Sequence, residues 1–139
     1  MSTRQQQWEA LPQARKDAGW LWTKLHSEII EQCEMLLNPD YFEPTIPPLP
    51  NGAVLSYAEP WFEKILIALR CASGDYVMDV SFDEDLLAVR YAVDRDPFPH
   101  DLLIVRRRGD SLLQTHDGAL LGAEETARRI VMALTYRSF

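Results

Sequence analysis

The sequence predicts an α+β protein: an N-terminal helix, an antiparallel β-meander of about five to six strands, and a C-terminal helix packed on the sheet. Three observations support this prediction. Apolar residues recur at helical spacing near both ends of the chain, prolines gather after the first of these segments, and apolar and polar residues alternate in between. With 139 residues, 47% of them hydrophobic and 25% charged, residues 1–139 are expected to form one globular domain.

The first helix is predicted to cover residues 12–37. Pro12 suits a first helical turn, where its missing N–H is not needed, and Asn38 followed by Pro39 ends the segment. Gly19 weakens the helix near its start, so the part from Gly19 onward is the firmer prediction. The expected apolar face carries Trp22, Leu25, Ile29, Cys33 and Leu36.

Residues 39–51 are predicted to form a stiff, extended connector. Five of the nine prolines of the chain lie in this stretch, and they exclude a regular helix or an inner strand. These prolines are Pro39, Pro44, Pro47, Pro48 and Pro50.

Residues 52–121 are predicted to form the antiparallel sheet, and two hairpins that share a strand carry the prediction. Lys64–Cys71 is expected to pair with Tyr76–Phe82, which pairs in turn with a strand after Glu84–Asp85. The shared strand presents the same apolar residues in both hairpins, as side chains of period two on one face must. The expected pairs are Cys71–Tyr76, Leu69–Met78, Ile67–Val80 and Ile65–Phe82, then Phe82–Leu87, Val80–Val89, Met78–Tyr91 and Asp79–Arg90.

Residues 60–71 leave an alternative open, because Pro60–Arg70 also fits a helical stripe. Ser56 and Glu59 would form the capping box of such a helix. The β-branched Ile65 and Ile67, together with the agreement between the two hairpins, favour the strand.

Further strands and a helix complete the expected fold. Gly109–Asp110 marks a turn between Asp101–Arg107 and Ser111–Thr115, with an expected three-residue loop that sets Val105 against Leu113 and Leu103 against Thr115. Gly52–Glu59 is the candidate sixth strand. Residues 123–137 are predicted to form the last helix, because acidic residues stand in its first turn and an apolar stripe follows.

The face of the sheet away from the core is expected to be too apolar to lie open to water. Besides polar residues, it is predicted to carry Leu86, Ala88, Ala92, Leu102, Ile104 and Leu112. Our hypothesis is that something covers this face: the N-terminal helix, a second copy of the chain in a homodimer, or a ligand.

Two candidate sites follow from this arrangement. Arg90, Arg106 and His116 are predicted to line a small anion pocket on the outer face, with Asp79 paired to Arg90 across the strands. Trp20 and Trp22 stand about 200° apart on a helix, so only one of them can face fully inward. The other is expected to mark a contact surface, because tryptophan is enriched in protein interfaces.

No catalytic residue, metal site or cofactor is predicted. His100–Asp101 and His116–Asp117 resemble the imidazole–carboxylate couples that orient a general base, but no nucleophile motif accompanies them. The third histidine, His26, lies far from both pairs in the sequence, and this scattering is untypical of metal ligands.

Charge and cysteine content narrow the function classes. A formal charge of −7 disfavours nucleic acid as a partner, and no apolar run has the roughly 20 residues of a membrane span. Cys33 and Cys71 form no motif, and no secretory signal is seen, so the cytoplasm is expected.

The leading hypothesis for the function is a non-catalytic interaction or accessory protein that binds a protein partner or itself. The alternatives are a domain that binds a small, anionic ligand and, third, an enzyme that uses a His–Asp pair.

Overall fold

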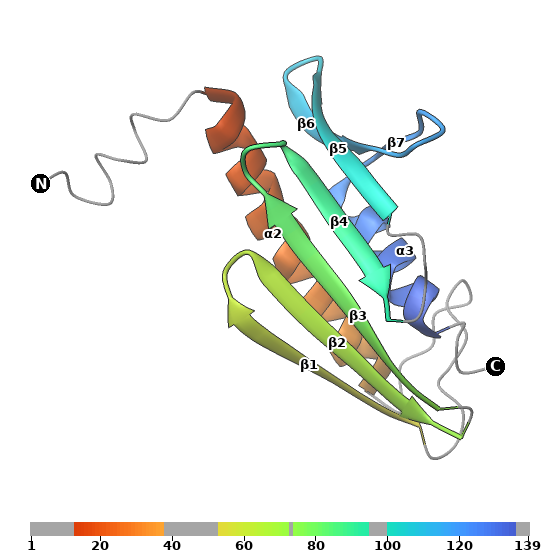
Figure 1. Ribbon diagram of the computed structural model, residues 1–139. Helices are drawn as coiled ribbons and strands as arrows, with labels where there is room; N and C mark the ends of the chain where they lie inside the picture. The colour runs from red at the N-terminus through yellow and green to blue at the C-terminus, as the bar shows by residue number, and fades with distance from the viewer. Residues whose placement is uncertain (1–12, 38–52, 73, 95–99, 136–139) are drawn as a thin grey trace, which may run out of the picture.

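The computed structural model describes residues 13–37, 53–72, 74–94 and 100–135, and it confirms the α+β class (Figure 1). The strands form one antiparallel seven-stranded sheet in the order β1 to β7, slightly more strands than expected. In chain order the elements are helix α2 (Gln13–Leu37), strands β1 (Val54–Trp61), β2 (Lys64–Cys71), β3 (Gly74–Asp83), β4 (Ala88–Val93), β5 (His100–Arg107), β6 (Asp110–Gln114) and β7 (Leu120–Leu121), and helix α3 (Ala123–Thr135).

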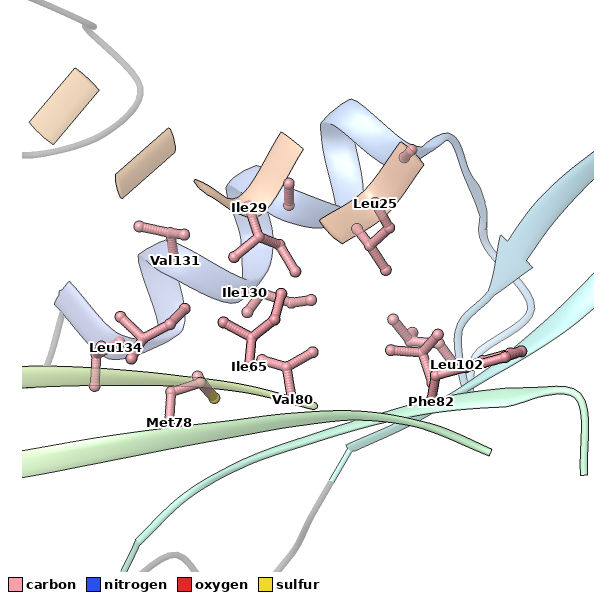
Figure 2. Close-up of a cluster of buried hydrophobic side chains, with 14 of the residues drawn as sticks. Leu25, Ile29, Ile65, Met78, Val80, Phe82, Leu102, Ile130, Val131 and Leu134 are labelled. Atoms are coloured by element: carbon pink, nitrogen blue, oxygen red, sulfur yellow. The ribbon is translucent and has the colours of Figure 1, made fainter. Parts of the chain in front are cut away.

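Both helices lie on the same face of the sheet, which we call the core face (Figure 1). They pack against each other and against the side chains of β2, β3 and β4 that point toward them. Figure 2 shows the centre of this core, where Ile29 of α2, Ile130 of α3 and Ile65 of β2 come together. The N-terminal helix therefore covers the core face, and the hypothesis that it covers the opposite, outer face is wrong.

The helices follow the apolar stripes of the sequence. In α2 the side chains of Trp22, Leu25, Ile29 and Cys33 are buried, and Gly19 is accommodated in the helix interior. In α3, Glu124 and Glu125 occupy the first turn, as expected for the positive end of a helix dipole. Pro12, residues 136–137 and the Pro-rich connector 39–51 lie outside the described residues. Neither of the described helices has the length and apolar character needed to cross a membrane.

Residues 64–71 are a strand, so the helical alternative for Pro60–Arg70 is wrong. The registers of the two central hairpins each differ from the expected ones by two residues. Ile67 stands opposite Met78, not Val80, and Val80 stands opposite Tyr91, not Val89. A shift of two residues leaves every side chain on its original face, so the predicted core residues are buried although their partners were wrong.

The turn between β3 and β4 is held by the Asp83 carboxylate. It accepts hydrogen bonds from the backbone N–H groups of Asp85 and Leu86, both at 3.0 Å. Leu87 then adopts a positive φ of 49°, and its carbonyl accepts a 2.8 Å hydrogen bond from the N–H of Ile104 in β5. This side-chain capping closes a four-residue loop in place of the tighter turn that the sequence suggested.

The turn between β5 and β6 has two residues, not the expected three. Arg107 stands opposite Asp110, and the residues between them, Arg108 and Gly109, both have positive φ, at 53° and 85°. A change of one residue in loop length reverses the faces of the strand. Leu102 and Ile104 therefore point into the core, and their predicted place on the outer face is wrong.

We expect Arg108→Asn to raise the free energy of unfolding by about 0.5–1 kcal/mol, because asparagine tolerates this left-handed turn conformation better than arginine. Urea denaturation of the two proteins at one pH measures the change. Gly109→Ala is the opposing variant: no atom lies within 4 Å of the added Cβ, so its expected loss of about 1 kcal/mol is conformational. Equal stability of all three proteins would contradict the assigned turn.

The two outermost strands are less regular than the central ones. The candidate sixth strand is β1, and it continues past Pro60 with a register irregularity between Ala58 and Trp61. A proline and a bulge are typical of a sheet edge, where they limit pairing with further strands. The additional strand, β7, consists of two residues that pair with β6.

Candidate functional site

Asp79 and Arg90 lie on the outer face, as predicted, but they are not partners. Asp79 Oδ2 is 2.8 Å from Lys64 Nζ. Arg90 donates two hydrogen bonds to Asp101, from Nε to Oδ1 at 2.7 Å and from a terminal nitrogen to Oδ2 at 3.2 Å. The predicted Asp79–Arg90 pair is wrong because of the two-residue register difference, which sets Asp79 opposite Ala92.

Arg106 lies on the core face, so its predicted place in an outer pocket is wrong. Its terminal nitrogen is 2.8 Å from Asp17 Oδ2 of α2, and this ion pair joins β5 to the helix. The cause is again the two-residue turn at Arg108–Gly109, which reverses the faces of β5.

His116 is exposed in the turn after β6 and lines a shallow depression of about 340 Å³. The depression is also lined by Asp101, Leu103 and Gln114, so a carboxylate stands where the prediction had a cation. The hydrogen bond from Arg90 lowers the pKa of Asp101, which therefore stays ionised at neutral pH. An anion would meet this negative charge, and the arrangement gives little support to an anion pocket.

Neither His–Asp sequence pair forms a side-chain hydrogen bond or an ion pair. Alternation along β5 sends Asp101 to the outer face and His100 to the core face, where its ring stacks on Tyr91 with centroids 4.8 Å apart. Asp117 instead accepts a hydrogen bond from the Thr115 hydroxyl, and this bond lowers the pKa of the Asp117 carboxyl. Both carboxylates are thus held by groups other than the neighbouring imidazole.

One of the two tryptophans of α2 is buried and the other is exposed, as the helical geometry requires. Trp22 is fully buried, and its Nε1 donates a 2.7 Å hydrogen bond to the carbonyl of Phe62, whereas Trp20 is 61% exposed. Trp22 is therefore the inward-facing tryptophan that the helical geometry predicts, and it is not available as an interface residue. Trp20 remains a candidate contact residue on the helical side of the molecule.

The described residues give little support to a nucleophilic cysteine or to a metal-binding site. Cys33 is buried, and desolvation together with the neighbouring Glu34 raises the pKa of its thiol to about 12. Such a thiol is almost entirely protonated at neutral pH and is a poor nucleophile. No cluster of three or more histidine, cysteine or acidic residues in the described ranges could hold a metal ion.

The outer face is the side of the sheet that neither α2 nor α3 covers (Figure 1). Several of its apolar side chains are strongly exposed: Leu86 is 67%, Trp61 59% and Leu103 52% exposed. Smaller or partly buried residues continue the apolar surface between them. These are Ala58, Leu66, Ala68, Val77, Ala88, Ala92, Val105 and Leu112.

Most of the charged side chains of the outer face form ion pairs within that face. Besides Lys64–Asp79 and Arg90–Asp101, Arg70 Nε lies 3.6 Å from Asp75 Oδ1. Strand alternation places four cations and five carboxylates on this side, a formal charge of −1 for the face. They are Lys64, Arg70, Arg90 and Arg107, and Asp75, Asp79, Asp83, Asp101 and Asp110.

Leu103 joins two shallow depressions on the outer face. It lines the depression of about 340 Å³ beside His116 and also one of about 280 Å³ that reaches Leu86, Ala88 and Arg90. Alternation in the sequence does not place Leu103 on the outer face, because the apolar run at 102–105 fits either face. The signal that could have placed it was Arg108–Gly109, if read as a two-residue turn with two positive φ values.

The fold and this surface define an α+β protein in which two helices cover one face of a seven-stranded antiparallel meander, while neither of these described helices covers its other face. Comparison with protein-family models, with curated proteins and with solved structures gave no match to the chain.

Proposed function

We propose that this chain is a non-catalytic interaction protein that binds a protein partner through the outer face of its sheet. The observation that carries the proposal is the exposure of Leu86, Trp61 and Leu103 on a face that neither described helix covers. Soluble proteins rarely leave a contiguous apolar surface in water unless it serves an interaction.

The chemistry of the face favours a protein over a small ligand. Its depressions are shallow, and the basic side chains Lys64, Arg70 and Arg90 each have a carboxylate partner within the face. Small-molecule sites are usually concave, with a few convergent polar groups, whereas protein interfaces combine an apolar centre with polar surroundings. The outer face resembles a protein interface.

We also propose that the protein acts in the cytoplasm and does not bind nucleic acid. The two cysteines of the sequence, Cys33 and Cys71, form no motif typical of a disulfide framework, which suits a reducing compartment. A net charge of −7 opposes the phosphate backbone of nucleic acid.

Exposed leucines on opposite sides of the molecule provide a test of the proposed surface. Leu103 on the outer face is 52% exposed, and Leu37 at the end of α2 is 50% exposed. We expect Leu103→Lys to abolish partner capture by the immobilised protein, because a lysine in the centre of an interface leaves a charge without solvent. Leu37→Lys is expected to retain capture. Quantitative mass spectrometry of bound proteins measures both, and equal capture by the two variants would refute the proposed surface.

A further inference from the structure

We infer that the partner of the outer face is a second copy of this chain, packed face to face around a two-fold axis near Leu103. The inference rests on the proposed function and assigns an occupant to the same surface. Three properties of the face point to a second copy: its charge balance, its internal ion pairs and its size.

The charge balance of the outer face is compatible with contact between two copies. The chain carries −7 and its outer face −1, so the rest of the molecule carries −6. Because the outer face carries only −1, two outer faces can meet with little repulsion. The outer face selects an apolar, nearly neutral partner, and a second outer face has this character.

The internal ion pairs make the face complementary to itself. Arg90 and Asp101 stand side by side on neighbouring strands, joined by bonds of 2.7 and 3.2 Å. A two-fold axis brings the same patch of each copy together in opposed orientation, so the Arg90 of each copy can approach the Asp101 of the other. Neither copy has to supply an additional counter-charge, and no charge in this pair is buried without a partner.

The size of the face is compatible with a dimer. Five adjacent strands at about 4.8 Å spacing, each contributing about seven residues of 3.3 Å, give a flat footprint of roughly 550 Å². Exposed side chains raise the accessible area above this value, toward the roughly 800 Å² per partner of a stable interface. Sheets that pack in this way keep their strands within about 30° of each other, which the twist of a single meander permits.

Analytical ultracentrifugation of variants at Leu103 tests the inference. We expect the wild-type protein to sediment near 32 kDa at about 100 μM, twice its 16.0 kDa chain mass. Leu103→Asp and Leu103→Lys are each expected to raise the dimer dissociation constant at least about 100-fold, because each sets two like charges against one another near the axis. An equimolar mixture of the two variants is expected to dimerise again. A partner other than this chain would give no such rescue.

Matched variants separate this effect from misfolding. Leu86→Lys, on the outer face at a residue that is 67% exposed, is expected to weaken the dimer as well, and Leu37→Lys on α2 is expected to leave it unchanged. All variants should keep the wild-type circular dichroism spectrum, since none of the substituted side chains is buried.

The outcomes distinguish the inference from the proposed function. A monomeric wild-type protein at 100 μM, unchanged dimerisation of both Leu103 variants, or no dimer in their mixture would overturn the second copy as partner. If the protein is monomeric but Leu103→Lys loses a captured protein that Leu37→Lys retains, the proposed function stands without the inference. If neither self-association nor capture depends on Leu103, both fail.

Discussion

Trp22→Ala is expected to lower the free energy of unfolding by about 3–5 kcal/mol, a large share of the roughly 5–15 kcal/mol typical of a domain. The side chain is fully buried, and its ring stacks on Phe82 with centroids 5.7 Å apart. Its loss also leaves the carbonyl of Phe62 without the 2.7 Å hydrogen bond from the indole. Urea denaturation followed by far-UV circular dichroism measures the change.

The same helix provides the control. Trp20 lies two residues earlier and is 61% exposed, so Trp20→Ala is expected to change stability by no more than about 0.5 kcal/mol. Trp22→Phe should fall between the two, because it keeps an aromatic ring in the core but loses the hydrogen-bond donor and part of the buried ring volume. Similar losses for Trp20→Ala and Trp22→Ala would show that the assigned orientation of α2 is wrong.

Val80→Asn is expected to destabilise the protein by at least about 3 kcal/mol, because it places an amide without partners in the apolar core. Val80 is fully buried in β3, and Figure 2 shows it beneath the helices beside Ile65. Thermal unfolding should show the loss as a decrease in Tm of roughly 10 °C or more.

An identical substitution on the same strand serves as the comparison. Val77 lies three positions before Val80, so it points to the outer face, and it is 36% exposed. Val77→Asn leaves the amide in contact with water, and its expected cost is below about 1 kcal/mol. Equal decreases in Tm for the two variants would be incompatible with the assigned faces of β3.

These comparisons show which parts of the fold the sequence could predict. The helices and the core face of the central strands follow from the spacing of apolar residues, and this spacing survives a register error of two residues. Ile65, Ile67 and Val80 are buried as expected although none has its expected partner. Periodicity determines which face a side chain takes, and it leaves the choice of partner to the turns.

The prediction of the candidate site depended on the face that β5 presents, and periodicity does not determine this face. At residues 102–105 four apolar side chains follow one another, so alternation could not choose a face for β5. The choice came from loop length, and the sequence Arg108–Gly109 gives only a weak indication of a two-residue turn because arginine is uncommon at its first position. Because the loop is one residue shorter than expected, Arg106 lies on the core face beside α2 and Leu103 lies on the outer face.

The linear order of the sheet has a consequence for the synthesis of the protein. Each strand pairs with the next along the chain, so the hairpins can form one after another as the polypeptide leaves the ribosome. The apolar side of this growing ribbon stays partly bare until α3, the last described element, is made and packs beside α2. A nascent chain that stalls before residue 123 would therefore expose part of the apolar side of its sheet as well as the opposite side, and it would be the species most prone to aggregate.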